Sequence, residues 1–317
     1  MFEKLLIERL APARRVGFLG LAKNTGKTTA FNYVSGVLHE RGERCGLITT
    51  GRDGEATDLL FGNPKSPVEA LPLQLLLTTG HEAGQSTADL RPIGDTRFNT
   101  SVGPLRTFEV IGKGRVVLVG PATCDELIVA IGSLIAGGCR RILVDGAINR
   151  KAFARPGVVD GIVACTGAAL SEDLDTLVDR TVDALGPFRG AGGTAGTHGP
   201  TNTRSSTTAP AEPEIEVAGA FTDDAAERLL EEGYAGTVIV ADATKVFLES
   251  YTRRRLEEAG VVIRPRVAVP ILFVCVNPTS PTGARLDSEA LLDRLGVALP
   301  ELPIMDVKTC RHHFTPS

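Results

Sequence analysis

Six consecutive residues could bind the phosphates of a nucleotide: Asn24, Thr25, Gly26, Lys27, Thr28 and Thr29. In a phosphate-binding loop, the glycine lets the backbone approach the phosphates, the lysine amine reaches the β and γ oxygens, and the threonine hydroxyl binds Mg2+. The usual pattern G-x-x-x-x-G-K-[ST] would place its first glycine at position 21, which is leucine here, with Gly20 one place earlier. We predict a site for Mg2+ and ATP, with GTP as the other candidate. A plain helix start with a threonine cap is the alternative.

Two acidic residues follow other predicted strands. Asp53 comes after the strand expected at residues 45–49, with Glu55 and Asp58 close behind, and Asp145 ends the strand expected at 140–145. Carboxylates at these positions can hold Mg2+ or orient an attacking water. We therefore predict Lys27, Asp53 and Asp145 as catalytic residues, and Thr28, Asp53 and Asp145 as metal ligands.

Asn277 follows a third predicted strand, at residues 270–276, and precedes a proline. Such a rigid loop could hydrogen-bond a nucleotide base, although an ordinary Asn-Pro turn fits equally well. Arg150 and Lys151 follow Asp145 and could bind a second anionic substrate, or they could form a solvated basic turn.

The elements that must position these residues form an alternating series. Continuous apolar runs predict strands buried on both faces, at residues 16–19, 45–49, 115–120, 140–145, 161–165, 236–241 and 270–276. Helical patterns lie between several of them, such as residues 28–41 and 125–136. This alternation predicts an α/β fold with a doubly wound, mostly parallel sheet.

Composition suggests how the chain divides. Residues 186–214 consist largely of Gly, Pro, Ser, Thr and Ala, which is typical of a flexible linker or insertion. We expect a phosphate-loop domain at 1–185. Residues 215–317 should form a smaller α/β domain, or else strands that complete the first sheet.

Charge and apolar content exclude some functions. A net charge of −4 and a pI of 5.8 offer no basic surface for nucleic acid. No apolar run reaches the roughly 18 residues of a membrane span, and the first residues lack the apolar centre of a signal peptide. The six cysteines are scattered and are expected to be reduced, mostly in the core. These features predict a cytoplasmic protein.

The tail that holds Cys310, His312 and His313 is expected to be polar rather than metal-binding.

Together, the loop, Asp53 and Asn277 resemble a branch of P-loop NTPases. This branch includes dethiobiotin synthetase, the molybdopterin-guanine dinucleotide accessory proteins and the MinD and nitrogenase-iron-protein group. The resemblance covers about the first 150 residues and the segment around Asn277. It makes a homodimer conceivable, but the extra lysine of the MinD group is replaced here by Ala22, with Lys23 one place off.

A narrower resemblance rests on four strings: "LAKNTGKTTAFNYV", "TTGRDGEATD", "VLVGPATCDELI" and "VDGAINRKAFARPGVVDGIVACTGAALS". They are similar to the reactivase subunits that accompany lysine 5,6-aminomutase, an enzyme that depends on adenosylcobalamin and pyridoxal phosphate. The resemblance implies an ATP-driven chaperone that ejects damaged cobalamin from the mutase. Its implied partners are the mutase and a second reactivase subunit.

Three functions therefore remain open at the level of sequence. The first is a nucleotide-driven switch or chaperone. The second is a small-molecule kinase or ATP-dependent ligase of the dethiobiotin synthetase type, which the Arg150 and Lys151 pair suggests. The third is a protein that binds nucleotide only as a sensor.

Overall fold

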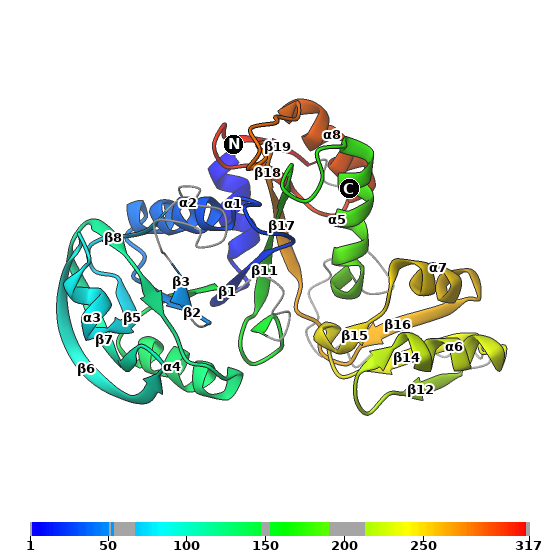
Figure 1. The fold of residues 1–317 in the computed structure, drawn as a ribbon, viewed down its shortest axis with the longest axis horizontal. Coiled ribbons are helices and arrows are strands. Elements are labelled where there is room, and N and C mark those ends of the chain that lie inside the picture. Colours follow the sequence, from blue (N-terminus) through cyan, green and yellow to red (C-terminus); the bar gives the residue numbers. More distant parts are fainter. Residues whose placement is uncertain (1, 51, 54–66, 147–152, 190–212, 315–317) are drawn as a thin grey trace.

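A large sheet organises the fold, which is known from a computed structural model that describes residues 2–50, 52–53, 67–146, 153–189 and 213–314. The sheet has ten strands (Figure 1). In spatial order they are β19 (Arg311–His313), β18 (Ile304–Asp306), β17 (Ile271–Asn277), β11 (Gly161–Gly167), β1 (Arg15–Gly20), β10 (Arg141–Asp145), β2 (Cys45–Thr49), β5 (Leu75–Thr79), β7 (Gly103–Gly112) and β6 (Asp89–Thr100). From β18 to β5 every neighbouring pair is parallel. The predicted α/β fold with a mostly parallel sheet is thus confirmed.

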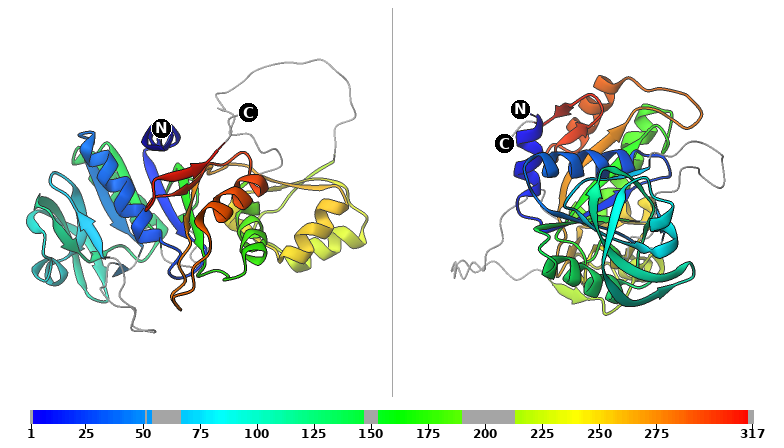
Figure 2. Two further views of the ribbon diagram at one scale, coloured as in Figure 1. Left: turned by 90° about the horizontal axis from the view of Figure 1, so that it is seen from above. Right: turned by 90° about the vertical axis from the view of Figure 1, so that its left-hand side faces the viewer.

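Helices cover both faces of this sheet (Figure 2). On one face, α1 (Phe2–Leu10) and α2 (Lys27–Glu40) bury their apolar side chains in one hydrophobic core. On the other face, α4 (Cys124–Ala136), α5 (Leu174–Arg189) and α8 (Ser288–Ala298) pack into a second core. Because the central strands are covered on both sides, β2 and β11 are buried along their whole length, as their continuous apolar runs predict, and so is β5, which the sequence analysis did not predict.

The end of the sheet beyond β5 is antiparallel, and apolar runs do not predict it. The β6–β7 hairpin pairs with β5 through β7, which leaves β6 as an edge strand. Most side chains of β6 are exposed, and its pairing shifts register near Pro92, as is common for edge strands. The short helix α3 (Gly80–Gly84) and the small strand pair β4 (Val68–Ala70) and β8 (Gly114–Val116) belong to the same region.

Residues after 213 contribute to two sheets. A separate three-stranded parallel sheet contains β12 (Glu214–Glu216), β14 (Gly236–Val240) and β16 (Val261–Pro265). Its core is closed by α6 (Asp223–Glu231), α7 (Ser250–Glu258) and the strand pair β13 (Phe221–Thr222) and β15 (Val246–Phe247), with the short helix η2 (Ala243–Lys245) before β15. Strands β17, β18 and β19 then return to the large sheet.

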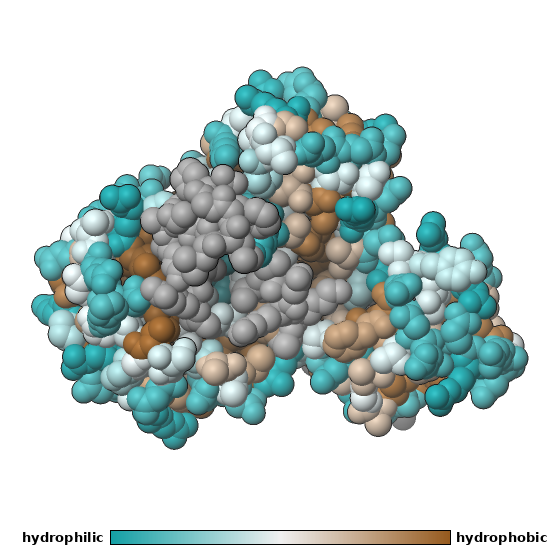
Figure 3. Space-filling view, in the orientation of Figure 1, coloured by the Kyte–Doolittle hydropathy of each residue, from teal (hydrophilic) through white to brown (hydrophobic). Residues whose placement is uncertain are grey.

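We name residues 213–265 the small unit. Figure 1 shows it beside the large sheet, and Figure 3 shows a mostly hydrophilic surface with several hydrophobic residues on the side toward the large sheet. Helix α5 continues to Arg189, into the range expected to be a linker, while residues 190–212 lie outside the described part of the chain.

No helix in the described ranges is both long enough and apolar enough to cross a bilayer.

One close approach fixes the segment that leads into α4. Strand β3 (Arg52–Asp53) pairs with β9 (Leu118–Val119), and Gly120 follows directly. A Cβ atom on Gly120 would overlap the carbonyl oxygen of Thr49 at the end of β2. Thr123 then caps α4, and its hydroxyl and amide exchange hydrogen bonds with Glu126.

We expect Gly120→Ala to lower the free energy of unfolding by about 2 kcal/mol, because the new methyl group must push two backbone segments apart. Gly36→Ala in α2 is the matched control, since nothing lies within 4 Å of a Cβ atom there. It should raise the free energy of unfolding by about 0.5–1 kcal/mol through the helix preference of alanine. Urea denaturation measures both, and a Gly120→Ala protein as stable as the parent would contradict the close packing.

Candidate functional site

The predicted phosphate loop connects the end of β1 to the start of α2. Gly20 ends the strand, Lys27 is the first residue of the helix, and Gly26 between them has a left-handed φ of 85°. Asn24 is also left-handed, with a φ of 63°. The buried Thr25 donates a hydrogen bond from Oγ1 to the carbonyl of Ala22 at 3.0 Å, which folds the loop back on itself. The loop therefore has its own internal geometry rather than a plain helix start.

The displaced glycine of the sequence pattern has a structural reason. A Cβ atom on Gly20 would lie 3.2 Å from both the carbonyl oxygen of Ala22 and Oγ1 of Thr25. Gly20 thus permits the tight turn of the loop, although it stands one position earlier than the first glycine of the usual pattern. The threonine-cap alternative is not found: the N-cap of α2 is Gly26, and no side chain caps the helix there.

Lys27 and Asp145 form a buried ion pair at the centre of the site. Nζ of Lys27 contacts Oδ1 of Asp145, and the side chains are 9% and 0% exposed. Asp145 ends β10, which lies directly beside β1 with Phe18 opposite Asp145. The carbonyl of Asp145 accepts hydrogen bonds from Oγ1 of Thr49 at 3.0 Å and from the amide of Thr50 at 3.2 Å. The end of β2 therefore holds the aspartate backbone in place.

Thr28 and Thr29 lie in the first turn of α2. Thr28 follows Lys27 directly and is buried, while Thr29 is half-buried. Hydroxyl and carboxylate oxygens are the hard ligands that Mg2+ prefers.

Asn277 comes from the far end of the chain and contacts the loop directly. Its Nδ2 donates to the carbonyl of Asn24 at 3.0 Å and to that of Thr279 at 3.1 Å, and its Oδ1 accepts from the amide of Thr279 at 3.4 Å. A Cβ atom on Gly26 would lie 3.1 Å from Cβ of Asn277. The Asn277 amide group is therefore used within the protein, and a contact with a base would have to replace one of these bonds.

A carboxylate that the sequence analysis missed joins two loops beside Asn277. Glu172, after β11, accepts hydrogen bonds from the hydroxyls of Ser280 and Thr282, after β17. These hydroxyl bonds lower the pKa of Glu172 below its usual value. Only the adjacency of β11 and β17 in the sheet brings the two loops together, so no local sequence signal could have identified the contact.

Part of the predicted site lies outside the described residues. The backbone of Asp53 pairs with Leu118 in the β3–β9 ladder, which places this residue just beyond the end of β2. The Asp53 side chain and all of Glu55, Asp58, Arg150 and Lys151 fall outside the described part. The structure thus brings together Asn24, Thr25, Gly26, Lys27, Thr28, Thr29, Asp145 and Asn277.

The carboxyl-terminal tail is not organised as one site. His313 Nδ1 lies 2.9 Å from Oδ1 of Asp293, Cys310 Sγ lies 3.5 Å from the Tyr33 hydroxyl, and the ring of His312 packs edge-on against that of Phe2. Among the residues that the structure describes, no three His, Cys, Asp or Glu side chains are grouped to hold a metal ion.

Comparison with known proteins adds little. No protein-family model and no curated protein matches the sequence. A solved structure of the signal recognition particle receptor FtsY from Elizabethkingia anophelis is similar over 93% of this chain and 70% of that chain, with 8% sequence identity and a TM-score of 0.29. A likeness this weak assigns neither family nor activity, so the site must be interpreted from its own residues.

We expect the Lys27 and Asp145 pair to act as a unit in stability. Lys27→Met or Asp145→Asn alone should lower the free energy of unfolding by about 3 kcal/mol, because each removes the group that offsets a buried charge. The double variant should lose much less than the sum of the two. Urea denaturation without nucleotide or metal measures the cycle. Additive losses would show that the two side chains are energetically independent.

The Glu172 contact predicts a pH dependence of the loop after β17. Because the folded-state pKa of Glu172 is lowered, its stabilising bonds are complete above the ordinary glutamate value of 4.5 and are lost as the pH falls through the lower folded-state value. An NMR pH titration should show the amide signals of Thr282 and Ala284 shifting with a midpoint below pH 4.5. Glu172→Gln should abolish this transition. An unchanged transition in that variant would assign it to another group.

Proposed function

We propose that this protein is a Mg2+-dependent nucleoside triphosphatase whose phosphate site is the loop from Gly20 to Thr29. The observation that carries the proposal is the buried contact between Lys27, at the start of α2, and Asp145, at the end of the neighbouring parallel strand. A lysine after a left-handed glycine can bind phosphate, and an acid on the adjacent strand can bind the metal that accompanies it.

The side chains fit this chemistry. The start of α2 directs backbone amides and the positive end of the helix dipole toward the loop, which favours phosphate. Lys27 would hold the β and γ oxygens, and Thr28 and Asp145, with Asp53, would provide oxygen ligands to the metal. Bound Mg2+ would neutralise charge on the phosphates. Lys27 would exchange its contact with Asp145 for one with phosphate. The metal would then balance the negative charge of Asp145.

The surroundings favour a switch, because a path of direct contacts leads away from the site. Strand β3 carries Asp53 and pairs with β9, and β9 runs through Gly120 into the cap of α4 at Thr123. A change at Asp53 that depends on the γ-phosphate could therefore move α4. Such a switch performs work only if the triphosphate and diphosphate favour different states.

The finer proposal is an ATP-dependent reactivating chaperone for a cobalamin-dependent aminomutase. It is supported by the resemblance of four strings, around Lys27, Asp53, Asp125 and Asp145, to reactivase subunits of lysine 5,6-aminomutase. The proposed partners are that mutase and a second reactivase subunit, and a homodimer is compatible with the wider resemblance. The small unit, attached beside the large sheet, offers a surface for a client (Figure 1).

Hydrolysis tests the proposal directly. We expect Lys27→Ala and Asp145→Ala to reduce phosphate release by about 100-fold or more, because each removes charge stabilisation at the transferring phosphoryl group. Lys113→Ala is the matched control: its ammonium forms an exposed pair with Glu69 and should leave the rate unchanged. Full activity of the Lys27→Ala protein would place the site elsewhere, and a protein that binds nucleotide without turnover would be a sensor.

Asp53→Asn should separate hydrolysis from binding. If Asp53 orients the attacking water, the rate should fall more than the affinity for nucleotide, since that role acts mainly in the transition state. An equal loss of both would make Asp53 a metal ligand instead. Phosphate release and nucleotide titration on the same protein provide the two quantities.

Adding a client decides between chaperone and small-molecule enzyme. Phosphate release with ATP and with GTP should rise when cobalamin-inactivated lysine 5,6-aminomutase is added. A rate of phosphate release that does not change with the mutase but rises with a carboxylate or amine metabolite would favour a kinase or ligase of the dethiobiotin synthetase type.

A further inference from the structure

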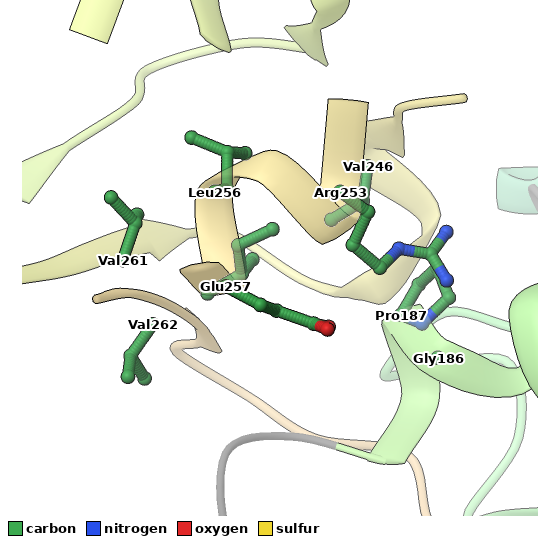
Figure 4. Close-up of a pocket in the computed structure, with 9 residues that line it drawn as sticks. Gly186, Pro187, Val246, Arg253, Leu256, Glu257, Val261 and Val262 are labelled. Carbon is green, nitrogen blue, oxygen red and sulfur yellow. The ribbon is translucent and has the colours of Figure 1, made fainter. Parts of the chain in front are cut away.

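A second candidate site, far from the phosphate loop in the sequence, lies where the small unit meets the end of α5. A cavity of about 180 Å³ opens there (Figure 4). Its lining includes Gly186, Pro187, Val246, Arg253, Glu257 and Val262. Its walls therefore come from α5 on one side and from β15, α7 and β16 of the small unit on the other.

Arg253 supplies a positive group with unused hydrogen-bonding capacity. One guanidinium nitrogen, Nη1, donates to the carbonyl of Asp183 in α5, which links the two parts of the chain. The Nε atom is buried and has no hydrogen-bond partner among the described residues. Burial lowers the pKa of Arg253, against the opposing effect of the charges on Asp183 and Glu257. A buried donor of this kind favours an acceptor from outside the protein.

The end of α5 is adapted to this arginine. A Cβ atom on Gly186 would overlap Nη1 of Arg253, so the guanidinium lies in the space that this glycine leaves open and would have to shift for a larger residue. Pro187 follows inside the last turn of α5. In Figure 4 the guanidinium lies beside Gly186 and Pro187, at one end of the cavity.

Glu257 supplies the opposite charge. It lies one helical turn after Arg253 on α7, yet the two side chains form no ion pair with each other within the described ranges. In Figure 4 the Glu257 carboxylate extends into the cavity, while Val261 and Val262 lie at the end away from Arg253. The lining thus combines a guanidinium and a carboxylate with branched aliphatic side chains.

We propose that this cavity binds a small aliphatic α-amino acid. Arg253 would hold the carboxylate, Glu257 the ammonium group, and the apolar lining contributed by β16 the aliphatic end. The volume of about 180 Å³ corresponds to about six water molecules and is well below that of sites for drug-sized ligands, so the ligand must be small. Two opposite charges held apart beside an apolar wall match a zwitterion with an apolar side chain better than a simple acid or amine.

Calorimetric titration of the full chain with L-leucine tests the proposal. We expect saturable binding with a Kd on the order of 1 mM or tighter. The analogue without the amino group, 4-methylpentanoate, and the analogue without the carboxylate, 3-methylbutan-1-amine, should each bind at least about tenfold more weakly, because each leaves one charged side chain without its partner.

Two variants identify the residues responsible, and two neighbours control for them. Arg253→Gln should weaken L-leucine at least about tenfold. Glu257→Gln should weaken L-leucine but leave 4-methylpentanoate unchanged, a pattern that a purely structural role would not produce. Arg254→Gln and Glu258→Gln change the same residue types one position further along α7, outside the cavity lining, and should bind as the parent does.

Because Arg253 also links α7 to α5, its variant must be checked for folding by circular dichroism. If it does not fold, Glu257→Gln on its exposed side chain carries the test. Absence of saturable binding by L-leucine would overturn the proposal. So would equal affinity for L-leucine and both analogues, or equal loss in the Glu258→Gln control.

Discussion

The buried contact between Lys27 and Asp145 is the constraint on which the site depends. Two opposite charges that are almost fully removed from water are stable only when held together with good geometry. That geometry requires β1 and β10 to be parallel neighbours in one register, with Phe18 opposite Asp145, and α2 to begin directly after the loop. It also requires Thr49 to fix the backbone of the acid from the next strand. The charged pair therefore forms only with this order of the central strands, and burying the pair in turn favours that order.

The rest of the site is assembled from segments that are distant in the chain. Asn277 at the end of β17 holds the carbonyl of Asn24, so the loop between β1 and α2 is fixed by a strand that follows the small unit. The carbonyl of Asn277 accepts the amide of Ala168, and Glu172 binds the next turn through Ser280. The large sheet is thus complete only after the chain has passed through the small unit.

Sequence predicted the parallel centre of the fold because strands buried on both faces must be continuously apolar, as residues 161–165 are. It did not predict the β6–β7 hairpin, whose edge strand is mostly exposed and therefore has no such run. Lys27 and Asp145 could be predicted because each stands at a defined end of a strand or helix. The Glu172 contact could not, because it depends on which strands become neighbours. The close packing of Gly20 within the loop could not be predicted from the sequence, because such packing follows no fixed spacing.

The most direct test is the affinity for a non-hydrolysable ATP or GTP analogue, measured by calorimetry with Mg2+ and with EDTA. If phosphate takes Lys27 from Asp145, the metal replaces the cation that faced this buried carboxylate, so nucleotide and Mg2+ should bind cooperatively. Removing Mg2+ should weaken the analogue at least about tenfold in the parent protein, and much less in Asp145→Asn, which has no carboxylate to compensate. Equal affinity with and without Mg2+ in the parent, or no binding of either analogue, would contradict a nucleotide site built on this ion pair.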